Sequence, residues 1–263
     1  MKNFDIKLSA AIRYVDERTL DLGTERLKSQ LNYLGFDEEN IIFVREGDFR
    51  ETFIASLERA NFEFDWHLIV DADILPFDNA VKNLLNFTCS VSNDVCVIQP
   101  HVSDKMMLTN RPAGVHLYKT SDIPEILKVA KSMPNSLRPE THALNAYRKI
   151  SNKCFINVPV LFGMHDYEQK YSDIYRKAFQ HGIKHKTYGQ ALLKEWLILG
   201  EKDYDYQIII KGYIEGYFSQ KNTCISSEDQ DLYENFKKLK IMEKQPLNIK
   251  NFEYETDSSQ IKR

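Results

Sequence analysis

Apolar runs and helical patterns alternate along the first part of the chain. Short apolar runs at 6–14, 40–44 and 66–70 predict strands. Between them, apolar residues recur every three or four positions, which predicts helices over 24–34 and 49–60. Strands and helices in this alternating order are typical of a mainly parallel, mixed central sheet flanked by helices on both faces. The predicted fold class is therefore α/β.

The second half of the chain is dominated by helical patterns. Two more strands are predicted, at 94–99 and 114–118, and helices are predicted at 79–85 and 121–130. Further helices are predicted at 171–181, 189–199, 203–217 and 228–239. We therefore expect two domains: one over residues 1–188 that contains the sheet, and a helical C-terminal extension with a polar tail over residues 189–263.

Composition narrows the class of protein. The chain has 263 residues, and its 35 Lys and Arg against 38 Asp and Glu give a net charge of −3. A nucleic-acid-binding protein normally carries a basic excess, so no nucleic-acid partner is expected. The four cysteines form no C-x-x-C pair, and no apolar stretch approaches the roughly 20 residues that span a bilayer. We expect a cytoplasmic protein; peripheral contact with the inner face of the membrane stays open.

The segment WHLIVDADILPF carries the most informative pair of side chains. Asp71 and Asp73 stand one residue apart, where a buried strand is predicted to end. Ligands of parallel sheets bind at the carboxyl ends of the strands. Two neighbouring carboxylates repel each other unless a cation lies between them, and oxygen ligands suit Mg²⁺ or Mn²⁺. The pair therefore predicts a divalent-metal site, with two solvated turn aspartates as the alternative.

This segment resembles the DxD motif of the GT-A glycosyltransferases, most closely their family-2-like group. The match consists of an apolar strand, Asp71-Ala72-Asp73 with Pro76 after it, and a helix that contains Leu84 and Leu85. Residues 114–121 (GVHLYKTS) resemble the acceptor-side strand of the same family. The resemblance covers about residues 5–190 and implies a GT-A fold, with nucleotide-sugar binding and catalysis in the first domain.

The resemblance also implies an activity. Enzymes of this group move a sugar from a nucleotide-sugar donor to a saccharide or a lipid-linked acceptor, with Mn²⁺ or Mg²⁺ as the cofactor. The implied enzyme is hexosyltransferase-like and inverting, and its donor is UDP-linked. Its implied role is in surface-polysaccharide or glycolipid synthesis.

Particular residues match positions that the family uses. The implied metal ligands are Asp71, Asp73 and a late histidine, His165, which follows an apolar run at 155–162. Glu140 matches the catalytic base at a helix start, where Thr141 replaces the family's second acid, and Asp166 is the rival base. The implied donor-binding residues are Arg13, Arg45, Glu46, Arg50 and Asp71. The alternatives are helix-start residues for His165 and Glu140 and surface charges for the arginines.

Two other functions stay open at this point. A phosphohydrolase of the haloacid dehalogenase type also places D-x-D after an apolar strand, but that family has the motif near its N-terminus. A non-catalytic sugar-binding protein could keep the same fold, because fold does not fix function.

Two further features concern partners. No acidic residue lies between Ile174 and Lys194. This basic stretch could steer a nucleotide sugar, contact an anionic membrane surface or face solvent. Gly212 and Gly216 give a G-x-x-x-G spacing in a segment too charged to span a membrane. We interpret it as core packing or as a contact in a homodimer.

Overall fold

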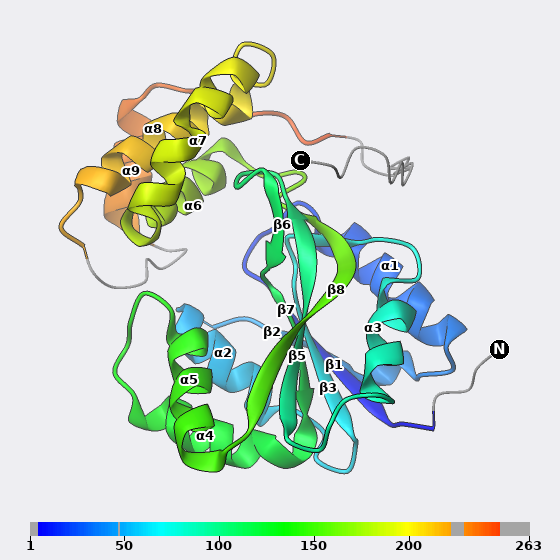
Figure 1. The fold of residues 1–263 in the computed structure, drawn as a ribbon. Coiled ribbons are helices and arrows are strands. Elements are labelled where there is room, and N and C mark those ends of the chain that lie inside the picture. Colours follow the sequence, from blue (N-terminus) through cyan, green and yellow to red (C-terminus); the bar gives the residue numbers. More distant parts are fainter. Residues whose placement is uncertain (1–4, 47, 222–228, 248–263) are drawn as a thin grey trace.

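The computed structural model describes residues 5–46, 48–221 and 229–247. Within them, eight strands form one sheet (Figure 1). The strands are β1 (Leu8–Arg13), β2 (Ile41–Val44), β3 (Trp66–Asp71), β4 (Ile74–Pro76), β5 (Val95–Asp104), β6 (Thr109–Pro112), β7 (Val115–Lys119) and β8 (Cys154–His165). They lie in the order β2-β1-β3-β7-β5-β8-β4, and β6 pairs with the end of β5.

The sheet is mixed, as the sequence pattern predicted. β1 pairs in parallel with β2 and β3, and β5 pairs in parallel with β8. β7, β4 and β6 run antiparallel to their neighbours. The strands β1, β2, β3, β5 and β8 therefore point the same way, and their carboxyl ends share one edge. Loops at such an edge bring together side chains from distant parts of the sequence.

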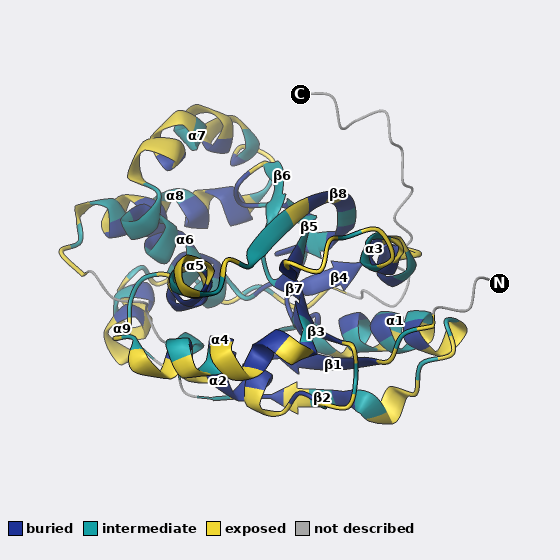
Figure 2. Cartoon of the chain, turned by 60° about the horizontal axis from the view of Figure 1, so that its bottom comes forward, coloured by how far each residue is buried: buried dark blue, intermediate teal, exposed yellow. Residues whose placement is uncertain are grey.

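Helices cover both faces of the sheet, and β1, β3 and β7 are among the most buried parts of the chain (Figure 2). One face packs against α1 (Leu20–Tyr33) and α3 (Ala80–Thr88). The other packs against α2 (Phe49–Glu58), α4 (Ile123–Ser132) and α5 (Pro139–Ser151). Because side chains alternate along a strand, β3 sends Leu68 and Val70 to the first face and Ile69 to the second.

A group of helices lies beside the carboxyl edge of the sheet (Figure 1). It consists of α6 (Tyr171–Lys184), α7 (Lys186–Leu199), α8 (Tyr204–Phe218) and α9 (Gln230–Lys238). The group has its own apolar core, which includes Trp196 and takes in Met106 and Met107 from the turn between β5 and β6. No helix in the described ranges is long and apolar enough to cross a bilayer.

This group contains the helical extension that the sequence predicted. Its core already includes α6, so the helices that pack together begin before residue 189. The division of the chain into 1–188 and 189–263 stays a prediction. The polar tail was predicted from Pro246, and its part from residue 248 onward lies outside the described residues, as does the first residue of the helix predicted at 228–239.

The glycines of the G-x-x-x-G segment lie where α8 crosses α6. A Cβ on Gly212 would overlap with the carbonyl oxygen of Tyr175, and one on Gly216 with that of Phe179. Glycine permits a close backbone approach of this kind because it has no side chain. The contact favours core packing over dimer contact as the interpretation of the motif.

Several elements were not predicted in full. The polar sequence of β6 (TNRP) has no strand pattern, and β4 has only three residues. β8 extends three residues beyond the apolar run at 155–162 and ends at His165. For α5, only the helix start near Pro139 was predicted. β4 and β6 are strands because they pair with β8 and β5, respectively, although their own sequences have no strand pattern.

Candidate metal and donor site

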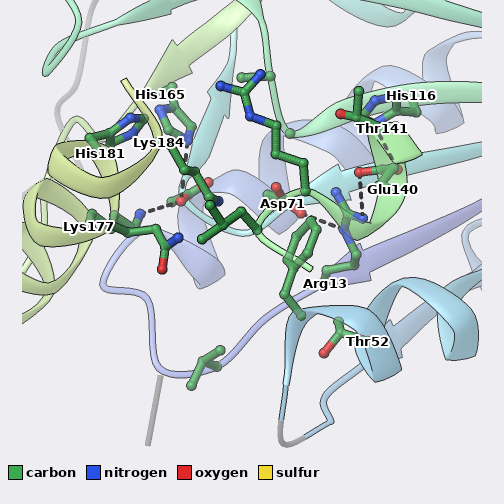
Figure 3. Close-up of a pocket in the computed structure, with 18 of the residues that line it drawn as sticks. Arg13, Thr52, Asp71, His116, Glu140, Thr141, His165, Lys177, His181 and Lys184 are labelled. Atoms are coloured by element: carbon green, nitrogen blue, oxygen red, sulfur yellow. Dashed lines mark hydrogen bonds and ion pairs between the residues drawn. The ribbon is translucent and has the colours of Figure 1, made fainter. Parts of the chain in front are cut away.

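A cleft of about 460 Å³ opens at the carboxyl edge of the sheet. Arg13 and Asp71 come from the ends of β1 and β3, Glu140 from the start of α5, and Lys177 from α6. Figure 3 shows His165 and Lys177 on one side, Arg13 and Glu140 on the other, and Asp71 between them. The α/β part and the helical group therefore both contribute to the lining.

Asp73, His165 and Asp166 offer ligand atoms that all lie within 4.8 Å of one another. Strand pairing brings them together, because His165 ends β8 opposite Ile74, the residue after Asp73. The Asp166 amide donates to the Asp73 carbonyl oxygen (3.2 Å). His165 Nε2 lies 3.5 Å from Asp73 Oδ2, and His165 Nδ1 lies 3.1 Å from Asp166 Oδ2. A φ of 63° at Asp166, which Asp tolerates better than most residues, turns the chain as it leaves β8.

The atoms of this set fit a divalent cation. Asp73 Oδ1, His165 Nδ1 and Asp166 Oδ2 are buried and make no hydrogen bond to the described part of the chain, although the last two form an ion pair at 3.1 Å. Buried polar atoms in native proteins are rarely left in that state. Two carboxylates and an imidazole are ligands compatible with Mn²⁺, and the carboxylates also suit Mg²⁺.

The electrostatics of the set favour a positive charge at this place. Burial would raise the pKa of Asp166, but His165 and Lys177 hold it well below its ordinary value. Burial would lower the pKa of His165, but Asp166, Asp73 and Asp104 raise it well above its ordinary value. A proton, an ammonium group or a metal ion could each supply the charge that the carboxylates require.

Lys177 supplies an ammonium group to the same carboxylates. Its Nζ donates to Asp73 Oδ2 and to Asp166 Oδ1, the latter at 2.7 Å. Asp104 Oδ2 lies 3.2 Å from His165 Nδ1, the same ring nitrogen that Asp166 approaches, and accepts from Arg111 Nε at 2.8 Å. The other ring nitrogen, Nε2, faces Asp73. Asp104 is thus placed to orient the imidazole, as an acidic partner often does for a histidine ligand.

A second set of buried charges lies on the opposite side of the cleft. Arg13 Nε donates to Asp71 Oδ1 (2.6 Å), and Arg13 Nη1 lies 3.3 Å from Glu140 Oε2. Glu140 Oε1 accepts from the Tyr118 hydroxyl (2.6 Å) and lies 3.3 Å from His116 Nδ1. Burial would raise the pKa of Glu140, but Arg13 and His116 lower it, so Glu140 is a carboxylate at neutral pH.

The structure brings Asp73 and His165 together with Asp166, where the expected set had Asp71. The reason lies in the strand register. Asp71 is the last residue of β3 and stands opposite Arg13 of β1, which holds its side chain. Asp73 lies beyond the strand, next to the start of β4. Asp71 still lines the cleft, so a donor-binding role stays a prediction for it.

Two neighbours shape the surroundings of Asp71. Burial and the neighbouring charge of Asp73 raise the pKa of Asp71 to about 6, although the Arg13 guanidinium lowers it. Gly114 has a φ of 61°, and a Cβ there would lie 2.9 Å from Asp71 Oδ2. The backbone at this point therefore needs glycine both for its conformation and for the space that the carboxylate takes.

The other predicted donor-binding residues are placed differently. Glu46 lines the cleft, and its carboxylate pairs with Arg59 at 2.9 Å. Arg45 lines a smaller pocket of about 270 Å³ instead. Arg50 donates to the carbonyl oxygens of Ala130 and Lys131. Of these three residues, the structure brings only Glu46 to the lining of the main cleft.

The basic stretch from residue 174 to 194 is helical, and its side chains divide. Lys194 is exposed on α7. Basic side chains of α6 and of the residue after it form part of the lining of the main cleft: Arg176, Lys177, His181, Lys184 and His185. Steering of a charged substrate is therefore the interpretation that the geometry favours over a merely solvated face.

Several residues of the site were not found from the sequence: Glu17, Asp104, His116 and Tyr118. Glu17 lines the cleft in the loop after β1, and burial together with Asp73 raises its pKa. A signal existed for Asp104, because it ends β5 as Asp71 ends β3. The predicted strand stopped at residue 99, so this strand-end acid was overlooked.

No protein-family model and no curated protein sequence matches the chain. Among solved structures, it is similar to a glycosyltransferase involved in the glycosylation of the major capsid of PBCV-1, with TM-score 0.43, 13% identity and coverage of 58% of this chain and 81% of that one. It is also similar to glucosyl-3-phosphoglycerate synthase from Mycobacterium tuberculosis, solved with Mn²⁺ and UDP-glucose (TM-score 0.43, 10% identity, coverage 63% and 73%). A third is 4-diphosphocytidyl-2C-methyl-D-erythritol synthase from Anaerococcus prevotii (TM-score 0.46, 8% identity, coverage 62% and 92%). At such values none of them transfers an activity to this chain, whose function has to be inferred from its own site.

Proposed function

We propose that this chain is a metal-dependent glycosyltransferase that moves a hexosyl group from a UDP-linked donor to a hydroxyl group of a saccharide or lipid-linked acceptor. The observation that carries the proposal is the convergence of Asp73, His165 and Asp166, with unsatisfied buried atoms, beside a cleft at the carboxyl edge of the sheet. The setting we propose is surface-polysaccharide or glycolipid synthesis in the cytoplasm, with peripheral contact to the membrane.

Asp73, His165 and Asp166 would hold Mn²⁺ or Mg²⁺ in this proposal. When bound, such an ion neutralises the charge that develops on a departing diphosphate. The chain supplies a further cation in Lys177, whose ammonium group would be free to meet the diphosphate once it leaves the two carboxylates. Arg13 keeps Asp71 in place on the floor of the cleft.

Glu140 is the base that we favour for the acceptor hydroxyl. Asp166 belongs to the set that would hold the metal, which leaves Glu140 as the other acid proposed from the sequence. Its carboxylate lines the cleft, is ionised at neutral pH, and is oriented by Arg13 and Tyr118. Deprotonation of the hydroxyl by such a carboxylate accompanies a single, inverting displacement at the sugar carbon.

A screen of nucleotide sugars tests this function. We expect UDP-sugars to raise the melting temperature of the protein only when Mn²⁺ or Mg²⁺ is present, because a ligand that binds the native state stabilises it. With a suitable acceptor, UDP should be released. Release of phosphate from simple monoesters would instead favour the phosphohydrolase. Sugar binding with no turnover and no metal dependence would favour a non-catalytic sugar-binding protein.

A further inference from the structure

The cleft is also lined by a group of basic side chains that have no place among the residues proposed above to hold the metal, the diphosphate or the acceptor hydroxyl. Arg111 comes from β6, Arg138 from the residue before α5, and His181, Lys184 and His185 from the end of α6 and the residue after it. We call these five residues the cationic wall. They come from three separate segments, so their convergence is a property of the fold and not of one charged helix.

Contacts within the cationic wall hold its side chains in place. Arg138 Nη2 lies 3.2 Å from Nε2 and 3.3 Å from Nδ1 of His185; one of these nitrogens is the acceptor of a neutral imidazole. The rings of His181 and His185 lie 5.2 Å apart with an angle of 31° between their planes. His181 Nδ1 is buried and makes no hydrogen bond to the described part of the chain. The wall thus presents an arginine in contact with the His185 ring and, at His181, a buried imidazole nitrogen without a hydrogen bond to the described residues.

The electrostatic field at the cationic wall is positive. Burial lowers the pKa of His185 to about 4, helped by Arg138, Arg111 and Lys184. Burial and Arg111 likewise lower the pKa of His181 to about 3. The carboxylate that opposes these cations is Asp104, which already pairs with Arg111 and His165. Both imidazoles are therefore neutral, while the potential around them favours an anion.

The location of the cationic wall indicates which substrate would carry that anion. Arg138 precedes Glu140, the base that we propose for the acceptor hydroxyl, by two residues. In Figure 3, His181 and Lys184 lie on the side of the cleft that also holds His165 and Lys177, whereas Glu140 and Thr141 lie on the other side. A molecule that reaches from Glu140 to the wall therefore has its reacting hydroxyl at one end and its charge at the other.

We propose that the cationic wall binds a phosphate group carried by the acceptor, at a subsite separate from that of the donor diphosphate. The assignment of this phosphate to the acceptor rests on the function proposed above. A phosphate monoester carries about −1.5 to −2 charges at neutral pH. Arginine suits it, because the guanidinium group offers paired donors to phosphate oxygens. A neutral sugar would leave the positive field of the wall without compensation.

The test uses the full chain saturated with Mg²⁺ and UDP, so that the donor subsite is filled. Glucose 6-phosphate is then titrated by calorimetry, with glucose as the uncharged control. We expect glucose 6-phosphate to bind and glucose to bind at least about tenfold more weakly, since hydrogen bonds to charged groups are the stronger ones. In Arg138→Gln, binding of glucose 6-phosphate should weaken by about tenfold. In Lys149→Gln, which changes an exposed lysine of α5 that does not line the cleft, the affinity should not change.

Three results would overturn the proposal. Glucose could bind as well as its phosphate, Arg138→Gln could bind the phosphate as wild type does, or UDP could abolish binding because both ligands use one subsite. Binding only to vesicles that contain phosphatidic acid, and not to the soluble phosphate, would instead assign the wall to a lipid surface. A failure of the donor function shows separately, as absence of metal-dependent UDP binding; the titration without nucleotide then still measures the wall.

Discussion

Lys177 and Asp166 form an ion pair at the centre of the candidate metal site, with 2.7 Å between Lys177 Nζ and Asp166 Oδ1. The same ammonium group also pairs with Asp73. Both carboxylates belong to the set whose ligand atoms converge. A divalent ion and Lys177 therefore compete for the same oxygen atoms, and the competing lysine comes from α6 in the helical group.

Replacement of Lys177 by methionine should strengthen metal binding in the absence of nucleotide. The substitution removes the ammonium group that now neutralises Asp73 and Asp166, but keeps a side chain of similar length. We expect the affinity for Mn²⁺ to rise on the order of tenfold, which corresponds to about 1.4 kcal/mol. Electron paramagnetic resonance of free Mn²⁺ measures this directly.

The matched control for this experiment is Lys194→Met, because Lys194 is exposed on α7 and does not line the cleft. It should leave Mn²⁺ affinity unchanged. Weaker binding of Mn²⁺ by Lys177→Met than by wild type would mean that the lysine supports the metal site and does not compete with the ion.

Glu140→Gln should separate donor binding from transfer. The amide keeps the size of the side chain but cannot accept a proton from the acceptor hydroxyl. We expect kcat to fall by about 10²–10⁴, the usual contribution of a general base, while UDP affinity stays within about twofold of wild type. If the rate is near normal and the KM for the donor rises, Glu140 positions Arg13 and is not the base.

Protonation of His67 should make the stability of the protein depend on pH. This histidine lies near the start of β3, at the end of the strand away from the metal set. Its ring is fully buried between the Ser9 hydroxyl (2.8 Å) and the Ser56 carbonyl oxygen (3.0 Å). Burial lowers the pKa of His67 from its ordinary 6.5 to about 4. The unfolded chain therefore takes up this proton first as the pH falls. Stability is complete above about pH 6.5 and is lost progressively towards pH 4.

Denaturant unfolding at two pH values checks this sign. Between about pH 7.5 and about pH 5, His67 should account for a loss of about 2 kcal/mol in the free energy of unfolding. Other groups titrate in the same range, so the comparison is with His67→Gln, whose amide can still donate to Ser56. That variant should lose less stability over this interval. An equal loss in both proteins would show that His67 is not the group responsible.

Gly216→Ala should disrupt the packing of α8 on α6. The new methyl group would overlap with the carbonyl oxygen of Phe179, and backbone cannot move aside as a flexible side chain can. Overpacking of this kind costs roughly 1–3 kcal/mol. Gly200→Ala is the milder comparison, because a Cβ there would meet the Trp196 carbonyl oxygen at 3.0 Å, a tight contact but no overlap, and the backbone φ is −65°. It should therefore destabilise the protein less than Gly216→Ala. Equal stability of the two variants would remove Gly216 from this account.

The sequence supported the fold better than it supported the site. The alternation of apolar runs and helical patterns up to residue 130 placed β1, β2, β3 and β7 and the helices between them, because each carries its own periodicity. β4 and β6 were missed because pairing with neighbouring strands, and not local sequence, makes them strands. The predicted mixed α/β sheet is confirmed by the strand order, and α7, α8 and α9 lie in the region predicted to be a helical extension.

The site could be predicted only in part, because its composition depends on register. The resemblance to the GT-A family suggested Asp73 and His165 as ligands of one metal, and the structure places their side chains 3.5 Å apart. The sequence could not show that Asp71 of β3 stands opposite Arg13 of β1, or that Asp166 turns back to Asp73. No sequence motif marks either relationship. Strand pairing creates the first, and the positive φ of Asp166 contributes to the second.

The central claim is that Asp73 helps to hold a divalent ion that the donor requires, and calorimetric titration of UDP in the presence of Mn²⁺ tests it most directly. Asp73→Asn is compared with wild type and with Asp78→Asn, whose carboxylate is exposed and pairs only with Arg26 among the described residues. We predict that Asp73→Asn weakens Mn²⁺-dependent binding of UDP by about 10–100-fold or more, while its circular dichroism spectrum stays that of wild type. Asp78→Asn should bind UDP with the affinity of wild type. Equal affinity of wild type and Asp73→Asn, or UDP binding by wild type that does not depend on the metal, would contradict the claim.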